Sequence, residues 1–510
     1  MTSSGVPQGA SDDDDLAQFG YQPRLRRSMS TFTSFCLAFS MIAITGTLGP
    51  LFQPVLAQVG AVAVWYWLIA LAGVIWVVLV FMHMAARIPV TGYAYQWASR
   101  IVNPYYGWVV AMIGLITFTT GATSIGALFG SVLAPELGID PTGTNIMFLA
   151  IGALTIGFLI NIFGIRIATR FNNGVAIGEI TATIVFAFLL LVGALLFFKG
   201  GQDASVIVNN SGVDGVDGSK IPTVNWILAA TLPIFALLGW EASADLAEET
   251  HNPRKAAPKA MFRAVTVSAL GGFVVMWIFI VAIPGSISEA LTHPNTFFWI
   301  VEERLGAFPA AIFKVIAFFS LMGCIVANIA VATRLIFSVS RDRMLPFSRQ
   351  LAAVHPRFRT PVTASIVLWA ICMAINIAGA GNIFRVTAMA AVAYYFTYGT
   401  TTIGVLIGHL RGSIPEPSGS GYFGLGRWTV PVCVIAIVWC FGVSAAYLVP
   451  SENHYVVRYF LYALGIGVLF TAYAWWALRT GRAAVPQNAT DAAAQRDRED
   501  AENEKAMVNG

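Results

Sequence analysis

One stretch of the chain combines a membrane-length apolar run with residues that interrupt a helix. Residues 223–243 read TVNWILAATLPIFALLGWEAS, in which Pro233 and Gly239 precede the carboxylate of Glu241. Proline removes a backbone hydrogen-bond donor and glycine readily adopts non-helical conformations, so the run predicts a helix that breaks midway. In lipid, the backbone groups freed by a break are tolerated only around a buried site or cavity. The stretch therefore predicts a site within a membrane-embedded helix bundle.

A second interrupted run lies near the beginning of the sequence. Residues 40–50 read SMIAITGTLGP, with Gly46, Gly49 and Pro50 at mid-membrane depth. Either run alone is equally consistent with close helix packing or a kink. Paired interruptions in corresponding spans of two halves, however, are the best sequence indication of the midplane site of a secondary transporter. The pairing, with a carboxylate beside the second break, favours a site.

The composition indicates that most of the chain lies in a membrane. Hydrophobic residues make up 57% of its 510 residues and charged residues only 11%, against about 25% charged in soluble domains. This balance excludes a water-soluble enzyme and the collagen, disordered and disulfide-rich secreted classes. An all-α polytopic fold is predicted, because runs of about 20 apolar residues cross a bilayer. Twelve such spans are expected, at residues 32–56, 62–86, 105–133, 145–165, 174–198, 223–249, 265–287, 310–340, 362–380, 383–410, 429–449 and 456–478.

The positions of the basic residues predict the orientation. If the N-terminus is inside, 24 of the 30 Lys and Arg residues fall on the inner side, where basic residues concentrate. The six others are Lys199, Lys220, Arg304, Lys314, Arg385 and Arg458. We therefore expect a multi-pass plasma-membrane protein with both termini in the cytoplasm. The net charge of +4 gives no indication of nucleic-acid binding.

The two breaks offer chemistry that suits a small zwitterion. Freed N–H groups at the start of a half-helix attract a carboxylate, and freed carbonyls at the end of the preceding half-helix attract an ammonium group. The aromatic side chains at the second break could close over a substrate. The expected binding residues are Ile42, Thr45, Gly46, Thr47, Phe235, Ala236, Gly239, Trp240 and Glu241.

Three motifs resemble those of a known group of transporters. They are GWEASADLAEETHNPRKAAPKA at residues 239–260, PVTGYAYQW at 89–97 and RDRMLP at 341–346. These motifs resemble the amino acid–polyamine–organocation superfamily of permeases, over about residues 16–480. The FGY at residues 19–21, which leads into a Phe- and Ser-rich first span, is similar to the amino acid–choline branch.

The resemblance implies a LeuT-type fold, in which spans 1–5 and 6–10 form inverted repeats and helices 1 and 6 are broken. The transport core would occupy residues 29–411, and peripheral spans 11 and 12 would lie within 412–480. A cytoplasmic tail over 1–28 and a disordered cytoplasmic tail over 481–510 would flank them. The implied activity is import of an amino acid or small amine by alternating access, coupled to protons or by exchange.

Four ionisable residues within the spans are candidates for coupling, because an intramembrane charge is costly and usually functional. Glu241 follows the second break and could bind a cationic group or carry a proton; the alternative is a structural cap of the following half-helix. Asp245 lies one turn further on, and an inner structural pair is an equal alternative. Glu179 and His83 are weaker candidates, more typical of pairing with a nearby arginine and of packing near a helix end. Some proton-coupled relatives carry a lysine in span 5, which this chain lacks.

Charged residues beyond the second break and after span 8 suggest an inner gate. Opposite charges on this side of the bundle could latch an inward-closed state, although a solvated membrane-flanking cluster explains them equally well. The residues are Glu248, Glu249, Arg254, Arg341 and Asp342.

Other functions fit the sequence less well. The six histidines form no nucleophile or metal constellation of an enzyme, no P-loop indicates direct use of ATP, and no cofactor or metal is expected. Ser320 and Asn328 in span 8 offer oxygen ligands for sodium, but they do not form the adjacent Ser/Thr pair that would make a sodium site persuasive. The alternative to a transporter is a transporter-like channel or nutrient sensor without net accumulation.

Overall fold

Most of the described chain is helical. The computed structural model describes residues 16–22, 25–208, 213, 220–379, 382–417 and 421–486; most of the predicted N-terminal tail and of the predicted disordered tail lies outside these ranges. The longer helices are α2 (Thr31–Ile42), α3 (Ile44–Val59), α4 (Tyr66–Arg87), α5 (Tyr93–Ile101), α6 (Pro104–Glu136), α7 (Gly143–Ile162), α8 (Ile165–Leu196), α12 (Pro253–Ala282), α14 (Thr296–Leu305), α15 (Ala307–Arg341), α17 (Val362–Gly379), α18 (Ile383–Leu410), α19 (Thr429–Leu448) and α20 (His454–Arg479). The shorter ones are α9 (Thr223–Ala229), α10 (Thr231–Ala236), α11 (Ala242–Asp245), α13 (Ile287–Ala290) and α16 (Ser348–Leu351).

Within the described ranges, ten helical runs are long and apolar enough to cross a membrane, which confirms the prediction of an all-helical, multiply spanning protein. One run, Thr31–Arg87, has 57 residues and contains α2, α3, the 3-10 turn Gly60–Trp65 and α4. The predicted spans 32–56 and 62–86 both fall within it. The predicted span 223–249 is instead divided into α9, α10 and α11, each far shorter than the roughly 20 residues that a crossing needs.

Two helices begin much earlier than their apolar runs suggest. α8 begins at Ile165 rather than at 174. It follows Gly164, whose φ of 115° is not helical and separates α8 from α7. α12 begins at Pro253 rather than at 265, because Asn252 is left-handed at φ 49° and proline is favoured in the first turn of a helix. In both cases polar residues extend the helix beyond its apolar part, so hydropathy alone misplaces the start.

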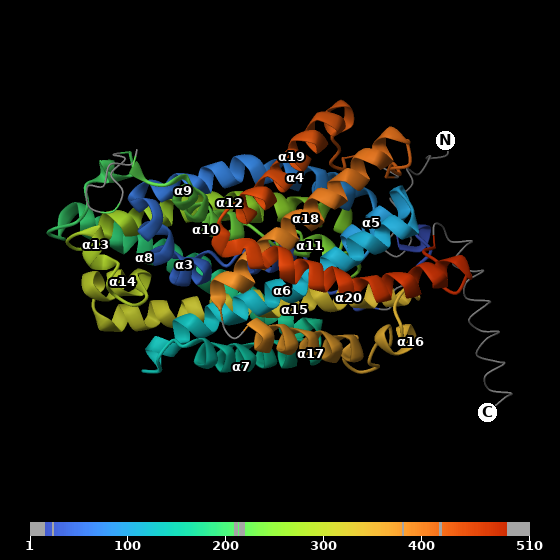
Figure 1. Ribbon diagram of the computed structural model, residues 1–510, viewed down its shortest axis with the longest axis horizontal. Coiled ribbons are helices and arrows are strands. Elements are labelled where there is room, and N and C mark those ends of the chain that lie inside the picture. Colours follow the sequence, from blue (N-terminus) through green and yellow to red (C-terminus); the bar gives the residue numbers. More distant parts are fainter. Residues whose placement is uncertain are drawn as a thin grey trace, which may run out of the picture.

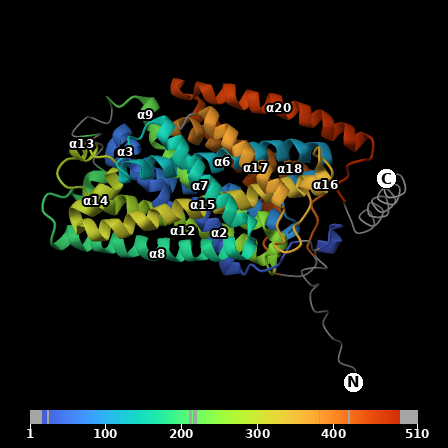
Figure 2. The same cartoon turned by 90° about the horizontal axis from the view of Figure 1, so that it is seen from below.

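The long helices pack lengthwise into one bundle (Figure 1). α6 packs against α18, α15 and α7, while α12 packs against α4 and α2. α8 and α20 lie at opposite outer edges (Figure 2). The short α13 and α14 lie at one end of the bundle, and α5 and α16 lie at the other (Figure 1). The two segments with predicted breaks contact each other within the bundle, where α3 packs against α10 and α2 packs against α11.

The first and last described segments meet at the end of the bundle that carries α5. Arg100 of α5 donates hydrogen bonds to the carbonyl oxygen of Phe19 at 3.1 Å and to that of Pro486 at 3.0 Å. The first and last described segments therefore lie at the same end of the bundle.

Candidate functional site

The first break lies between α2 and α3. Ala43 adopts left-handed angles, φ 47° and ψ 64°, and its N–H closes α2 by donating to the carbonyl of Phe39. Because this conformation costs an L-residue roughly 1–2 kcal/mol, the surrounding structure must hold it. The break precedes the residues 45–47 around which the sequence placed it. Gly46 and Pro50 lie within α3, which continues through both residues.

The second break separates α10 from α11. α10 ends at Ala236, and residues 237–241 leave the helix until α11 begins at Ala242. Gly239 has φ 85°, and a Cβ there would lie 2.6 Å from Met41 Cε and 2.9 Å from Met41 Cβ. Glycine is required because the conformation is left-handed and because the two broken segments touch at this point. The chain thus leaves the helix where the sequence predicts it.

At each break, a side chain from a neighbouring helix accepts a hydrogen bond from a freed N–H group. Thr45 N donates to Glu179 Oε1 of α8 at 2.9 Å. Gly239 N donates to the hydroxyl of Tyr398 of α18 at 3.2 Å, and that hydroxyl donates to Glu241 Oε2 at 2.5 Å. These bonds tie the unwound backbone to two helices that do not break.

A closed cavity of about 20 Å³ lies between the two breaks. Its volume is roughly that of one water molecule, so the described conformation is closed around the site. Three predicted binding residues line it, namely Ile42, Thr47 and Phe235. The other lining residues are Met41, Gly121, Ile125, Leu238, Cys324, Asn328 and Tyr394.

The other predicted binding residues do not line this cavity; they are Thr45, Gly46, Ala236, Gly239, Trp240 and Glu241. Thr45 and Gly46 form the first turn of α3, where backbone N–H groups lack helical partners, and Ala236 is the last residue of α10. Trp240 packs against the rings of Phe81 and Tyr398, with centroid separations of 5.2 Å in both cases, and is fully buried. Its ring therefore packs against α4 and α18 beside the second break and does not close over the cavity.

The sequence predicted residues that line the cavity only on the two interrupted segments. Gly121 and Ile125 lie on α6, Asn328 lies on α15 and Tyr394 lies on α18, all of which are continuous helices. Such helices are apolar on most faces, so their periodicity does not identify the face that meets the site. Polar residues at membrane depth were the available signal, and it had drawn attention to Asn328 as a possible sodium ligand.

Two carboxylates lie beside the second break without an ion-pair partner among the described residues. Glu241 is fully buried and Asp245 is 1% exposed. Neither oxygen of Asp245 has a hydrogen-bond partner within the described ranges. An ionised carboxylate is costly in such surroundings unless a cation or a proton accompanies it. No three His, Cys, Asp or Glu side chains of the described chain gather closely enough to hold a metal ion.

His83 lies away from both breaks, beneath the segment that precedes α19. Its Nδ1 accepts a hydrogen bond from Leu425 N at 3.1 Å. One turn on, Arg87 donates to the carbonyl of Phe423 at 3.0 Å and forms a 3.0 Å ion pair with Glu416. His83 thus helps to fasten this segment to the end of α4.

The predicted gate residues lie together at the same end of the bundle as α5, in an arrangement that includes an unpredicted partner. Arg341 pairs with Glu248 at 3.0 Å, and Glu249 pairs at 2.8 Å with Arg334, which lies about two turns before Arg341 in α15. Arg254 donates to the carbonyls at the end of α4. All three arginine side chains are nearly or fully buried, so these are not solvated flanking charges.

The N-terminal segment crosses this charged cluster. Tyr21 donates to Asp342 Oδ1 at 2.6 Å, and Tyr95 donates to Asp342 Oδ2 at 2.7 Å. Burial raises the pKa of Tyr21 to about 12, with Asp342 adding to the effect, so the hydroxyl keeps its proton. The Arg341 guanidinium lies 3.5 Å from the centre of the Tyr21 ring, and Met29 pairs with the backbone around Thr250. The segment therefore joins the second broken helix to α5 and α15.

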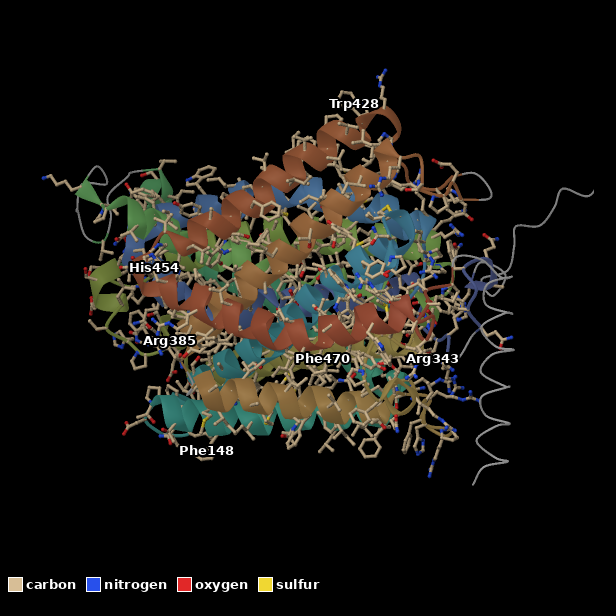
Figure 3. All side chains as sticks on the ribbon, turned by 45° about the vertical axis from the view of Figure 1, so that its right-hand side comes forward. Phe148, Arg343, Arg385, Trp428, His454 and Phe470 are labelled. Atoms are coloured by element: carbon tan, nitrogen blue, oxygen red, sulfur yellow. The ribbon has the colours of Figure 1, made fainter. Side chains whose placement is uncertain are left out.

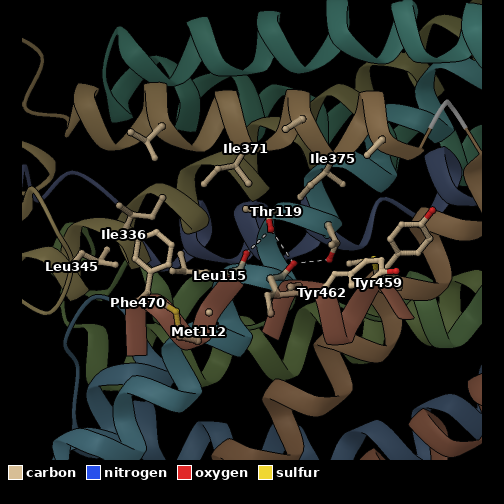
Figure 4. A pocket seen from close by; sticks show the side chains of 18 of the residues that line it. Met112, Leu115, Thr119, Ile336, Leu345, Ile371, Ile375, Tyr459, Tyr462 and Phe470 are labelled. Carbon is tan, nitrogen blue, oxygen red and sulfur yellow. Dashed lines mark hydrogen bonds between the residues drawn. The ribbon is translucent and has the colours of Figure 1, made fainter. Parts of the chain in front are cut away.

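A much larger hollow, of about 920 Å³, lies on the outside of the bundle among α6, α17, α18 and α20. Apolar side chains such as Leu115, Ile371 and Phe470 line it, and the hydroxyl of Thr119 turns back to its own helix (Figure 4). Phe470 lies on the exposed α20, between Arg385 toward one end and Arg343 toward the other (Figure 3). Neither break contributes to this hollow, so its size does not make it the substrate site.

Comparisons with known proteins agree with this architecture. An uncharacterised amino-acid permease of Schizosaccharomyces pombe is 26% identical, over 91% of this chain and 88% of the relative. Amino-acid permease 2 of Neurospora crassa is 23% identical over 90% and 87%, and an amino-acid permease of Arabidopsis thaliana is 21% identical over 88% and 90%. The sequence model of the amino acid permease family matches residues 29–471. With two broken helices meeting at a closed cavity, the chain therefore belongs to the amino acid permease family of the amino acid–polyamine–organocation superfamily and is a multi-pass membrane transporter of amino acids.

Proposed function

We propose that the protein imports an amino acid or small amine across the plasma membrane by alternating access. The observation that carries this proposal is the closed cavity between Ala43 and Gly239, at which both broken helices meet. Gly46 N in the first turn of α3 would bind the carboxylate, since Thr45 N and Thr47 N already donate to Glu179 and Ala43. Met41 and Ile42 at the end of α2 line the cavity, and the Ile42 carbonyl would accept from the amine, since that of Met41 already accepts from the Cys324 thiol. A zwitterion of one amine and one carboxylate matches this pair of helix ends.

An inverted repeat of five plus five helices is supported by how the breaks are held. The first broken helix is fastened by Glu179, on the fifth span of the chain, and the second by Tyr398, on the tenth. These positions correspond if spans 6–10 repeat spans 1–5 with opposite orientation. Each half then holds its own break with its own fifth helix.

The same inverted-repeat arrangement implies twelve membrane crossings. At 1.5 Å per residue, the 57-residue run would be about 85 Å long, nearly three times the roughly 30 Å hydrocarbon core. It therefore supplies two crossings, and the interrupted segment from Thr223 supplies another. Added to the nine other apolar runs, these give twelve, with both chain ends in the cytoplasm as the distribution of basic residues favours.

A proton bound at Glu241 and Asp245 is the proposed coupling ion, with Glu179 as an alternative carrier. Glu241 and Asp245 lie buried beside a break that must move, and the described chain offers them no ion-pair partner. A proton removes the cost of an uncompensated carboxylate without needing a coordination sphere. The inner gate is formed by Glu248, Glu249, Arg254, Arg341 and Asp342 together with Arg334.

Transport by purified protein in vesicles tests the proposal. An imposed inward proton gradient should drive saturable accumulation of a radiolabelled amino acid above its external concentration, and a proton ionophore should abolish it. Accumulation that instead follows a sodium gradient, or that needs unlabelled amino acid inside, would identify sodium coupling or exchange. A channel would only equilibrate the label, and a nutrient sensor would bind it without flux.

A further inference from the structure

We propose that Asn328 selects substrates whose side chain carries an uncharged hydrogen-bond donor, such as a hydroxyl or an amide. This inference rests on the proposed function, because it concerns the same cavity. Asn328 lines that cavity and is 3% exposed. Its Oδ1 is buried and has no hydrogen-bond partner among the described residues. An amide oxygen left unsatisfied beside a substrate cavity is an acceptor available to the substrate.

The position of Asn328 places it one helical turn from the proposed backbone-binding groups. Cys324, four residues earlier on α15, also lines the cavity, and its thiol donates to the carbonyl of Met41 at 3.0 Å. Met41 is near the end of α2, where the substrate amine is expected. One turn advances about 5.4 Å along a helix, which is the reach of a short amino-acid side chain.

The orientation of the amide is held by its neighbours. Asn328 Nδ2 donates to the hydroxyl of Tyr394 at 3.4 Å, so Oδ1 is the end left for the substrate. The Tyr394 ring packs edge-on against Phe118, with 5.8 Å between centroids. Gly121 faces the pair, and a Cβ there would lie 3.2 Å from the Tyr394 hydroxyl and 3.3 Å from Asn328 Nδ2. The absence of a side chain at Gly121 leaves room beside the amide.

The chemistry of the lining distinguishes three classes of substrate side chain. No charged residue is among the described residues that line the cavity, so a charged side chain would be buried without a counter-ion. An apolar side chain would leave Asn328 Oδ1 unsatisfied after water has been expelled. A hydroxyl or amide donor satisfies it, and sites built to bind such a donor reject analogues that lack it strongly.

The test compares ligands of equal shape. Threonine and valine differ by a hydroxyl in place of a methyl group, and glutamine and methionine form a second pair of similar length. We expect threonine to compete for uptake at least tenfold better than valine, and glutamine at least tenfold better than methionine. Asn328→Leu, which keeps the volume and removes the acceptor, should reverse both preferences. Asn328→Asp keeps an acceptor and should retain them.

A matched control is Asn376→Leu, because Asn376 on α17 is also buried with its Oδ1 unpartnered in the described chain but does not line the cavity. It should leave both ratios unchanged. Equal competition by threonine and valine in the unaltered protein would overturn the inference while leaving amino-acid transport intact. The same holds if Asn328→Leu keeps the original ratios. If neither member of either pair competes or stabilises the purified protein, this inference fails, whereas the proposed function is tested separately by gradient-driven uptake.

Discussion

Breaking the ion pair between Arg334 and Glu249 should open the inner end of the bundle. Arg334 Nε lies 2.8 Å from Glu249 Oε1, and the two side chains are 1% and 0% exposed. Removing one member of so deeply buried a pair costs about 3–5 kcal/mol, because the other charge remains buried alone. Water entering an inward-open state would hydrate Glu249, so Arg334→Met destabilises the closed state selectively. The inward-open population should rise roughly 100- to 4,000-fold at about 1.4 kcal/mol per tenfold change.

Alkylation of Cys324 measures this opening. Cys324 lines the central cavity and is 1% exposed, so a reagent from the inner side reaches it only when the gate is open. The assay uses inside-out vesicles, a membrane-impermeant maleimide, and a background in which the four other cysteines are replaced, namely Cys36, Cys372, Cys433 and Cys440. The labelling rate should rise with the inward-open population.

Two controls separate gate opening from general damage. Arg334→Met combined with Glu249→Met removes both charges and should return the rate toward that of the unaltered protein, since apolar replacement of a buried pair is often neutral. Lys314→Met removes an ion-pairing residue from the opposite end of α15, where the side chains are partly exposed, and should change the rate little. Equal Cys324 reactivity with and without Arg334, or a double variant as reactive as the single one, would refute the reasoning.

Three other substitutions test the site and its surroundings. Glu241→Gln should abolish gradient-driven accumulation while the protein remains folded in detergent; unchanged uptake kinetics would exclude a coupling role. Gly239→Ala should weaken substrate binding at least tenfold in a thermal-shift titration, because its Cβ would lie 2.6 Å from Met41 Cε. Gly138→Ala is the control, with a similar φ of 69° and open space, and equal effects of the two would mean that strain alone matters. Tyr21→Phe removes the 2.6 Å bond to Asp342 but keeps the ring beneath Arg341; it should raise Cys324 labelling roughly tenfold, and no change would mean that the N-terminal segment does not restrain the gate.

The sequence predicted the all-helical, multiply spanning fold and the second break because both depend on local composition. A long apolar run must be a helix in lipid, and Gly239 beside Trp240 and Glu241 marks a conformation that only glycine tolerates. The first break was displaced because it falls on Ala43, a residue with no intrinsic preference for φ 47°. Contacts with the rest of the bundle impose that angle, and the glycines that drew attention serve close packing instead. A Cβ at Gly46, for example, would lie 2.9 Å from Leu321 Cγ.

Long-range partners could not be predicted for a related reason. Tyr398 follows Gly239 by 159 positions and Arg334 follows Glu249 by 85, and nothing local marks either as a partner. The N-terminal residues Phe19 and Tyr21 were recognised only as a motif. In the folded chain the Phe19 ring contacts Arg100 of α5 and the Tyr21 ring contacts Arg341 of α15. These contacts depend on where the bundle places α5 and α15.

Four acidic residues in one short segment divide into two pairs with different consequences. Glu248 and Glu249 form ion pairs with Arg341 and Arg334, which bind the segment to α15. Glu241 and Asp245, one to two turns earlier, have no ion-pair partner among the described residues and are equally buried. A proton there lowers the cost of keeping the segment buried, whereas its loss favours a hydrated, open state. Because both pairs lie on the same segment, the proposed protonation of Glu241 and Asp245 would act on the gate pairs of Glu248 and Glu249 through that segment.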